Sequence, residues 1–121
     1  NLREVTIWGD GSPKRELIYV DDVADACVYF MNKRIKETTI NIGTGRDFSI
    51  KQYANIILKT IYPKNNLKFK FDKKKPNGTP RKILNVDLAK KYGWKAKTDL
   101  KKAILITYQD FLSKNNLKKF L

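Results

Sequence analysis

Alternating apolar and polar positions mark four short stretches of this chain as β-strands. Residues 4–8 form the first stretch and end at a Gly-Asp-Gly-Ser-Pro turn, and residues 16–20 follow that turn as the second. Residues 38–43 are the third. Residues 67–72 alternate apolar and basic side chains with period two, as expected of a half-buried strand.

The strongest helical pattern begins after Ser49. Gln52 follows three residues later, so the pair predicts a capping box at the start of a helix. The apolar residues that follow recur with the helical period and are Ile50, Tyr53, Ala54, Ile57, Leu58 and Ile61.

Three further helices are expected. Asp21 or Asp22 would cap the first, which runs to about Lys33. Its predicted buried stripe consists of Val23, Ala24, Cys27, Phe30 and Met31. Asp87 would cap a short helix that Gly93 ends, and apolar residues between positions 100 and 112 stripe a terminal helix.

Alternating strands and helices indicate the α/β class. At 121 residues the chain is long enough for one globular domain, and we assign residues 1–121 to a single unit. Few, short strands with about three amphipathic helices favour an accessory lobe over a complete doubly wound domain. The chain starts without an initiator methionine and enters a strand almost at once, so we expect a piece of a longer protein.

The net charge of +14 points to an anionic partner, either nucleic acid or a phosphorylated small molecule. The alternative is an ordinary solvated surface, because most of the cations are lysines spread along the whole chain. A nucleic-acid-binding domain would interleave exposed aromatic residues with its cations. Here most aromatic residues fall in strands or on apolar stripes, and no known binding signature occurs, so no nucleic acid is expected.

Composition also limits the compartment and the chemistry. One cysteine, Cys27, excludes an internal disulfide, and the absence of histidine removes the commonest metal ligand and general base. Cys27 lies in the predicted buried stripe and is interpreted as a core residue. No apolar run reaches the roughly 18 to 20 residues of a membrane span, and no signal peptide is visible. We therefore expect a cytoplasmic protein that has no membrane partner and no bound metal.

Two glycine-rich passages and one tyrosine–lysine pair resemble parts of the motifs of dinucleotide-binding dehydrogenases. Residues 9–14 and 43–48 each lack the last glycine of GxGxxG, so both are interpreted as turns that need positive φ. Tyr29 and Lys33 have the YxxxK spacing of a dehydrogenase acid/base pair. No dinucleotide fingerprint precedes them, so we do not interpret them as catalytic.

The passage KPNGTPRK, residues 75–82, predicts a stiffened basic loop, since its prolines and its Asn-Gly pair exclude a regular helix. Trp8 precedes the first turn and could offer a flat face to a base or a sugar. Arg15 follows that turn with a guanidinium suited to a diphosphate. The other candidate substrate-binding residues are Lys68, Arg81 and Lys82.

Three blocks, residues 8–26, 41–54 and 71–86, followed by Gly93-Trp94, resemble the C-terminal part of the GDP-L-fucose synthases. These are extended short-chain dehydrogenases/reductases. The first two blocks are common among nucleotide-sugar epimerases, and the KPxGTPRK block is the specific one. The resemblance implies a lobe that binds a GDP-sugar and closes against a Rossmann domain absent from this chain.

The implied enzyme binds NADP through that missing domain, forms a homodimer, epimerises GDP-4-keto-6-deoxy-D-mannose at C3 and C5, and reduces C4. Its catalytic and cofactor-binding residues have no counterparts here. The resemblance assigns substrate contacts to Trp8, Arg15, Lys68, Arg81 and Lys82. Asn77 replaces the usual aspartate of the motif and is a further candidate contact. This departure leaves open a related enzyme that acts on another GDP-linked keto-sugar, such as a deoxy-heptose.

Overall fold

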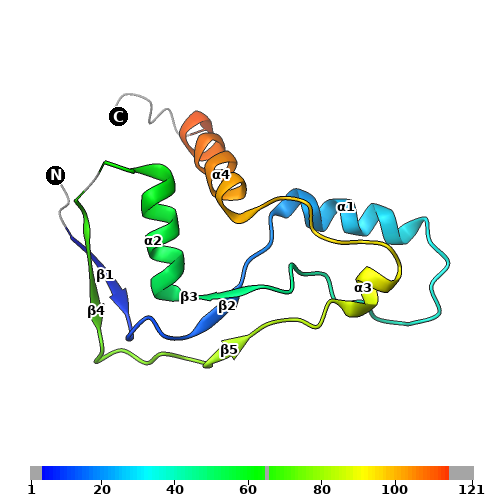
Figure 1. The fold of residues 1–121 in the computed structure, drawn as a ribbon, viewed down its shortest axis with the longest axis horizontal. Helices are drawn as coiled ribbons and strands as arrows, with labels where there is room; N and C mark the ends of the chain where they lie inside the picture. The colour runs from blue at the N-terminus through cyan, green and yellow to red at the C-terminus, as the bar shows by residue number, and fades with distance from the viewer. Residues whose placement is uncertain (1–3, 65, 115–121) are drawn as a thin grey trace.

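The computed structural model describes residues 4–64 and 66–114 and has the α/β composition expected from the sequence (Figure 1). Five strands and four helices alternate along this part of the chain. They are β1 (Glu4–Trp8), β2 (Lys14–Glu16), α1 (Val20–Met31), β3 (Asp47–Ser49), α2 (Ile50–Ile61), β4 (Lys68–Asp72), β5 (Arg81–Lys82), α3 (Asp87–Lys91) and α4 (Leu100–Lys114).

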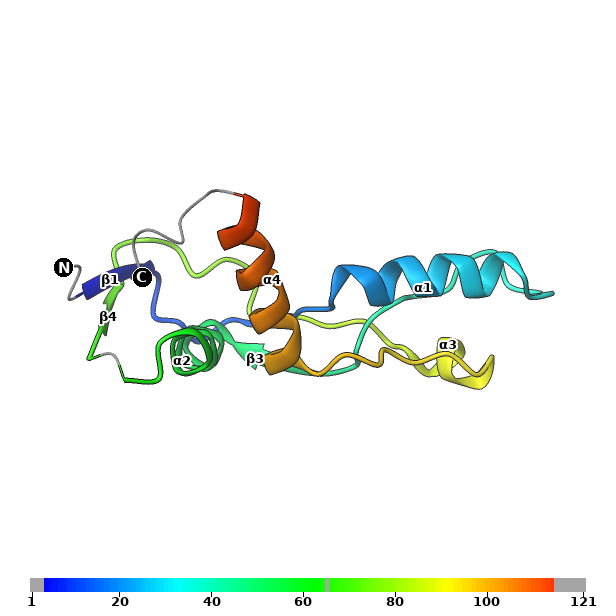
Figure 2. The same ribbon diagram turned by 90° about the horizontal axis from the view of Figure 1, so that it is seen from above.

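The strands form two small sheets. Parallel strands β1 and β4 form the first, in the register Glu4 opposite Lys68 to Trp8 opposite Asp72. The second has the order β3-β2-β5, in which β2 is antiparallel to β3 and parallel to β5. The molecule is elongated, with β1, β4 and α2 at one end and α1 and α3 at the other (Figures 1 and 2).

The predicted capping box is confirmed at the start of α2. The Ser49 hydroxyl accepts from the Gln52 N–H at 3.1 Å, and the Gln52 side chain accepts from the Ser49 N–H at 2.8 Å. The next two N–H groups donate to carbonyls of the turn between β1 and β2, Ile50 to Pro13 and Lys51 to Gly11. These bonds fix the turn to the helix end and leave no free donor there for an anion.

The predicted strand over residues 16–20 is wrong in its position. The strand is Lys14–Glu16, and the chain leaves it before entering α1 at Val20. The neighbouring strands decide this, because β3 and β5 offer ladder partners only to residues 14–16. Ile18, in the middle of the predicted strand, instead packs its side chain against the core around Trp94.

The predicted strand over residues 38–43 is also wrong. This segment bends at Thr38 and Gly43, and within residues 4–64 and 66–114 its backbone makes no hydrogen bond. Ile40 and Ile42 pack inward against the core, so the alternating pattern is real. A strand also needs a neighbouring strand, and the described part of the chain provides none there.

Two expectations for α1 are wrong. Tyr19 precedes the helix, with no side-chain cap, and both Asp21 and Asp22 lie in its first turn. Cys27 is exposed, and Met31 is 83% exposed, although the pattern placed both in the core. The residue that is fully buried is Ala26.

The core at this end of the molecule consists of Ala26, Ala89 and Trp94. Carboxylates of α1 hold the passage after α3 against it. Asp22 is buried and accepts from the N–H groups of Lys97 and Thr98 and from the Thr98 hydroxyl, at 2.9 to 3.2 Å. The paired aspartates predicted to cap the helix therefore include one that fixes a distant segment.

Helices α3 and α4 lie where the sequence predicts them. Gly93 ends the short helix with φ of +90°, a conformation that favours glycine. Asp87 is its first residue, not its cap, and its N–H donates to the Asn85 side chain at 2.9 Å. Helix α4 packs against α2. In the described part of the chain, every helix is too short or too polar to cross a membrane.

Candidate functional site

Arg15 and Lys82 lie directly opposite each other in the central sheet. They are Cα partners in the parallel pair β2 and β5, so their side chains leave the sheet on the same face. Arg15 is partly buried and Lys82 is exposed. The structure thus brings together two of the cations that the sequence nominated, one on each strand.

Trp8 lies at the end of β1, where the turn into β2 begins. Its side chain is 70% exposed, and the Lys75 ammonium lies 5.2 Å from its ring centroid. An exposed indole with a cation over its face offers aromatic surface next to positive charge. The sequence nominated Trp8 for this exposure, and the structure places it beside the basic loop.

The basic loop between β4 and β5 is held at two points. The Asn77 side-chain oxygen accepts from the Asp10 N–H at 2.8 Å, and the Pro80 carbonyl accepts from the Lys14 N–H at 2.8 Å. Between them, Gly78 adopts φ of +73° beside the Arg15 guanidinium. The loop therefore connects Trp8, through Lys75, to Arg15 along one continuous surface.

Arg81 and Lys82 were nominated together, but they leave β5 on opposite faces because they are consecutive strand residues. The Arg81 guanidinium binds Asp47 of β3 with two hydrogen bonds, of 2.5 and 3.3 Å. The Arg81 guanidinium lowers the pKa of the Asp47 carboxyl below its ordinary value. Arg81 thus already has a carboxylate partner.

Lys68 lies at the far end of β4 from the other candidates. It is opposite Glu4, whereas Asp72 is opposite Trp8. Four strand residues span about 13 Å, so Lys68 is not brought together with Trp8 within this lobe.

Glu16 is an organising residue that the sequence analysis missed. One carboxylate oxygen accepts from the N–H groups of Thr44 and Gly45 at 2.5 and 2.6 Å, and the other accepts from the Leu84 N–H at 2.9 Å. Successive backbone N–H groups of this kind form an anion-binding nest. Nothing in the sequence around Glu16 indicates that its side chain binds these backbone N–H groups.

The two glycine-rich passages are therefore turns, as predicted. Glu16 fills the nest of the Gly43-Thr44-Gly45 turn, and a Cβ on Gly43 would lie 2.6 Å from its carboxylate. In the other passage a Cβ on Gly9 would lie 2.3 Å from the Asn77 side-chain oxygen. The N–H groups of the Gly43-Thr44-Gly45 turn are therefore occupied by a side-chain carboxylate, and Gly9 and Gly43 are places where the turn leaves no room for a side chain.

Tyr29 and Lys33 do not form an acid/base pair. The Tyr29 hydroxyl donates to the Tyr92 carbonyl at 2.8 Å, and the Lys33 ammonium lies over the tyrosine ring, 4.9 Å from its centroid. A catalytic lysine would lie near the hydroxyl, so this geometry agrees with the sequence interpretation. Within residues 4–64 and 66–114, no cluster of three or more metal-ligating side chains is present.

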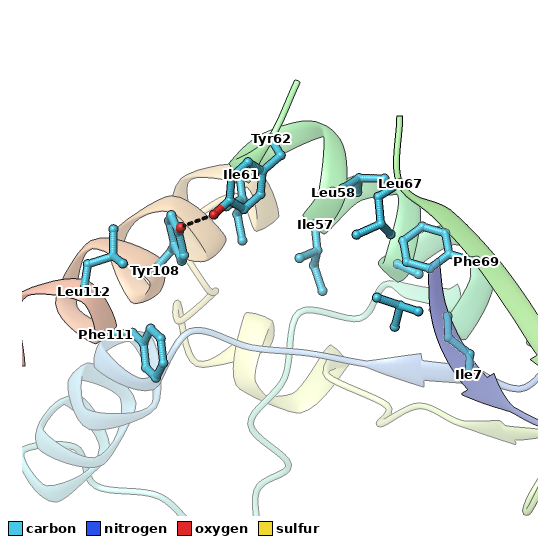
Figure 3. Close-up of a pocket in the computed structure, with 12 residues that line it drawn as sticks. Ile7, Ile57, Leu58, Ile61, Tyr62, Leu67, Phe69, Tyr108, Phe111 and Leu112 are labelled. Carbon is cyan, nitrogen blue, oxygen red and sulfur yellow. Dashed lines mark hydrogen bonds between the residues drawn. The ribbon is translucent and has the colours of Figure 1, made fainter. Parts of the chain in front are cut away.

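An apolar groove of about 550 Å³ lies between the β1–β4 sheet, α2 and α4, and it includes none of the candidate residues (Figure 3). Tyr62 and Tyr108 meet at its edge through their hydroxyls at 3.2 Å. A smaller hollow of about 430 Å³ is lined by Lys82, Glu16 and neighbouring apolar residues, so it adjoins the candidate site.

Comparisons with known proteins point to one group of enzymes. Residues 1–43 match the family described as NAD dependent epimerase/dehydratase. GDP-L-colitose synthase of Yersinia pseudotuberculosis is 40% identical over 114 residues, which are 93% of this chain and 36% of that protein. GDP-L-fucose synthase of Escherichia coli (strain K12) is 37% identical over 121 aligned residues, covering 93% of this chain and 37% of that protein.

Solved structures agree with this grouping. A GDP-6-OMe-4-keto-L-xylo-heptose reductase from C. jejuni superposes with a TM-score of 0.81 at 31% identity, over 93% of this chain and 34% of that one. A GDP-mannoheptose C4 reductase from Campylobacter jejuni with NADP bound has a TM-score of 0.73 at 34% identity, over 88% and 34%. The chain spans about a third of the length of these relatives. Over nearly all of its length it is homologous to part of the GDP-L-fucose synthases, as its motifs predicted.

Proposed function

We propose that residues 1–121 are the C-terminal substrate-binding lobe of an NADP-dependent GDP-keto-sugar epimerase/reductase of the GDP-L-fucose synthase type. The observation that carries the proposal is the Arg15–Lys82 pair on one sheet face, joined to exposed Trp8 by the anchored basic loop. Two adjacent cations suit a diphosphate, and an exposed indole suits a base or a sugar.

The proposed reaction belongs to the longer protein that contains this lobe. NADP binds to a Rossmann domain outside residues 1–121 and supplies the hydride that reduces C4, after epimerisation at C3 and C5. That domain also carries the catalytic residues, and the longer protein is a cytoplasmic homodimer. The lobe contributes substrate contacts from Trp8, Arg15 and Lys82.

The other candidate contacts have different supporting geometry. Arg81 reaches a substrate only by exchanging Asp47 for a phosphate, and Lys68 reaches one only from the far end of β4. Asn77 is engaged with the Asp10 N–H, which supports a scaffolding role. We therefore rank these three below the Arg15–Lys82 pair.

The sugar is the finer part of the proposal. Relatives of similar identity are named as fucose, colitose and heptose enzymes, so similarity alone favours none of them. The primary assignment is GDP-4-keto-6-deoxy-D-mannose, and the alternative is a related GDP-linked keto-sugar such as a deoxy-heptose. Both leave the GDP contacts of the lobe unchanged.

The test is an assay of NADPH oxidation by the longer protein with each GDP-keto-sugar. We expect turnover with GDP-4-keto-6-deoxy-D-mannose and none with the 121-residue chain alone. A charge-assisted hydrogen bond contributes about 1.5 to 3 kcal/mol, while association costs about 4 to 15 kcal/mol, so the lobe alone should bind GDP-sugar weakly. Turnover by the 121-residue chain would refute the assignment of the catalytic residues to another domain.

Nucleic-acid binding is the rival from another class. Titration of the chain with GDP and with a short oligonucleotide, each at two salt concentrations, separates the two. Oligonucleotide affinity that exceeds GDP affinity and falls steeply with salt would contradict the proposed function.

A further inference from the structure

Trp8 and Lys75 are brought together by the hydrogen bonds of one carbonyl group. Trp8 and Asp72 are Cα partners at the ends of β1 and β4. The Asp72 carbonyl accepts from the Gly9 N–H at 2.9 Å and from the Lys75 N–H at 3.1 Å. The second of these bonds closes a turn, which returns the chain from Asp72 to Lys75 beside the indole.

The backbone of Lys75 is also restrained on its other side. Pro76 follows it, and a residue before proline is restricted to extended conformations. Asn77 then accepts from the Asp10 N–H at 2.8 Å in the turn after β1. The segment that carries Lys75 is therefore attached to the end of β1 both before and after the lysine, which limits where its side chain can lie.

The Lys75 ammonium covers one face of the Trp8 ring, at 5.2 Å from the ring centroid. A cation within about 6 Å of an aromatic centroid is attracted by the negative charge of the ring face. An indole has two faces, and the Trp8 side chain is still 70% exposed. The contact therefore holds the ring in one orientation and leaves its other face open.

We infer that Lys75 is a positioning residue for Trp8, because it holds the indole so that the face opposite the ammonium receives the base or the sugar of the GDP-sugar. The inference rests on the proposed function, which makes Trp8 a substrate contact. An exposed side chain that rotates freely must be ordered when a ligand binds, and this ordering weakens affinity. A ring that Lys75 already holds avoids part of that loss. The effect of Lys75 therefore falls on substrate affinity and leaves the chemical step unchanged.

A direct contact between Lys75 and a substrate phosphate is the alternative, because an ammonium is also a phosphate ligand. The two roles differ in their dependence on Trp8. A positioning residue acts only through the indole, whereas a phosphate contact acts without it. A double-mutant cycle separates the two roles.

The kinetic test uses the longer protein with Lys75→Met, which keeps a long unbranched side chain and removes its charge. We expect KM for the GDP-sugar to rise about 2- to 5-fold, the range of an exposed cation–π contact, with kcat and the KM for NADPH unchanged. Lys75→Arg should restore the unmodified KM, because a guanidinium forms the same contact. Lys73→Met removes an exposed charge from the same turn and is the matched control, with KM unchanged. In a Trp8→Leu background, Lys75→Met should change KM no further.

The orientation of the ring is measured without substrate, by fluorine NMR of the longer protein labelled with fluorotryptophan. The Trp8 resonance is the one that disappears in Trp8→Phe. Lys75→Met should shift this resonance by more than Lys73→Met does, because only Lys75→Met removes the charge next to the ring face. This readout depends neither on the identity of the sugar nor on turnover.

An unchanged Trp8 resonance or an unchanged KM in Lys75→Met would overturn the inference. An effect of Lys75→Met on KM that persists in the Trp8→Leu background would also overturn it, because it assigns Lys75 to the substrate itself. Absence of turnover of every GDP-keto-sugar by the unmodified longer protein would instead reject the proposed function. The NMR result then still decides whether Lys75 holds the ring.

Discussion

The Glu16 carboxylate accepts a hydrogen bond from the Leu84 N–H at 2.9 Å and so connects the end of β2 to the chain that leaves β5. Strand β5 contains only two residues, Arg81 and Lys82, too few to fix its own register firmly. By extending the attachment two residues beyond Lys82, Glu16 holds that lysine opposite Arg15. Glu16 therefore acts on the candidate site by positioning Lys82.

Replacing Glu16 by alanine should destabilise the protein by about 2 to 3 kcal/mol, since three backbone N–H groups lose a charged acceptor. Urea unfolding at neutral pH measures the change. Glu4→Ala, at an exposed position on β1, should stay within about 0.5 kcal/mol of the unmodified protein. A Glu16→Ala variant as stable as that control would show that the hydrogen bonds of Glu16 contribute nothing to the free energy of unfolding.

Arg15→Ala should raise KM for the GDP-sugar in the longer protein by about 10- to 100-fold, the value of one charge-assisted hydrogen bond. NADPH affinity should remain almost unchanged, because the proposed cofactor site lies in another domain. Steady-state kinetics with each substrate varied in turn measures both. Arg46→Ala, which removes an exposed arginine outside the Arg15–Lys82 pair, is the matched control. Equal loss of both affinities would identify Arg15 as structural.

The Asp47–Arg81 pair should make stability depend on acid pH. The pKa of Asp47 is lowered chiefly by its hydrogen bond with Arg81, so the folded carboxyl binds a proton less readily than the unfolded one. The pair therefore contributes stability at pH values above the ordinary carboxyl pKa of 3.8 and loses it as the pH falls through the lower, folded pKa.

Arg81→Ala should accordingly be less stable than the unmodified protein at neutral pH, and the difference should shrink in acid. Urea unfolding over a pH series measures it, with Lys73→Ala as the control for removing a cation from the exposed basic loop. A difference that stays constant down to acid pH would mean that Arg81 acts through another group.

At high salt Asn77→Asp should be tolerated, within about 0.5 kcal/mol, because a carboxylate oxygen can accept from the Asp10 N–H as the amide oxygen does at 2.8 Å, and salt screens its repulsion by the neighbouring Asp10 carboxylate. Asn77→Ala should cost about 1 kcal/mol, the net value of one hydrogen bond. Thermal or urea unfolding compares the two variants directly. If both cost the same, the Asp10–Asn77 bond does not anchor the loop.

Local patterns predicted several elements well. The capping box of Ser49 and Gln52, the strand over residues 67–72 and the glycine that ends α3 depend on neighbours within a few residues, which the sequence displays. Trp8 and Arg15 were nominated from the turn between them, and the structure places the basic loop against both. The family resemblance followed from the same local motifs.

Contacts between distant segments decided the rest. Strand β2 consists of residues 14–16 because only these residues pair with β3 and β5. Residues 38–43 do not form a strand because the described part of the chain provides no neighbouring strand for them. Packing against Trp94 buried Ala26 of α1 and left Met31 exposed, a choice that the apolar pattern alone did not predict. The sequence by itself determined which segments are helical or extended and which side chains could bind an anion. Only the tertiary structure decided that Glu16 accepts from the Gly43-Thr44-Gly45 turn, that Arg81 binds Asp47 and that Lys82 lies on the same sheet face as Arg15. The physical reason is that strand register sets the direction of each side chain.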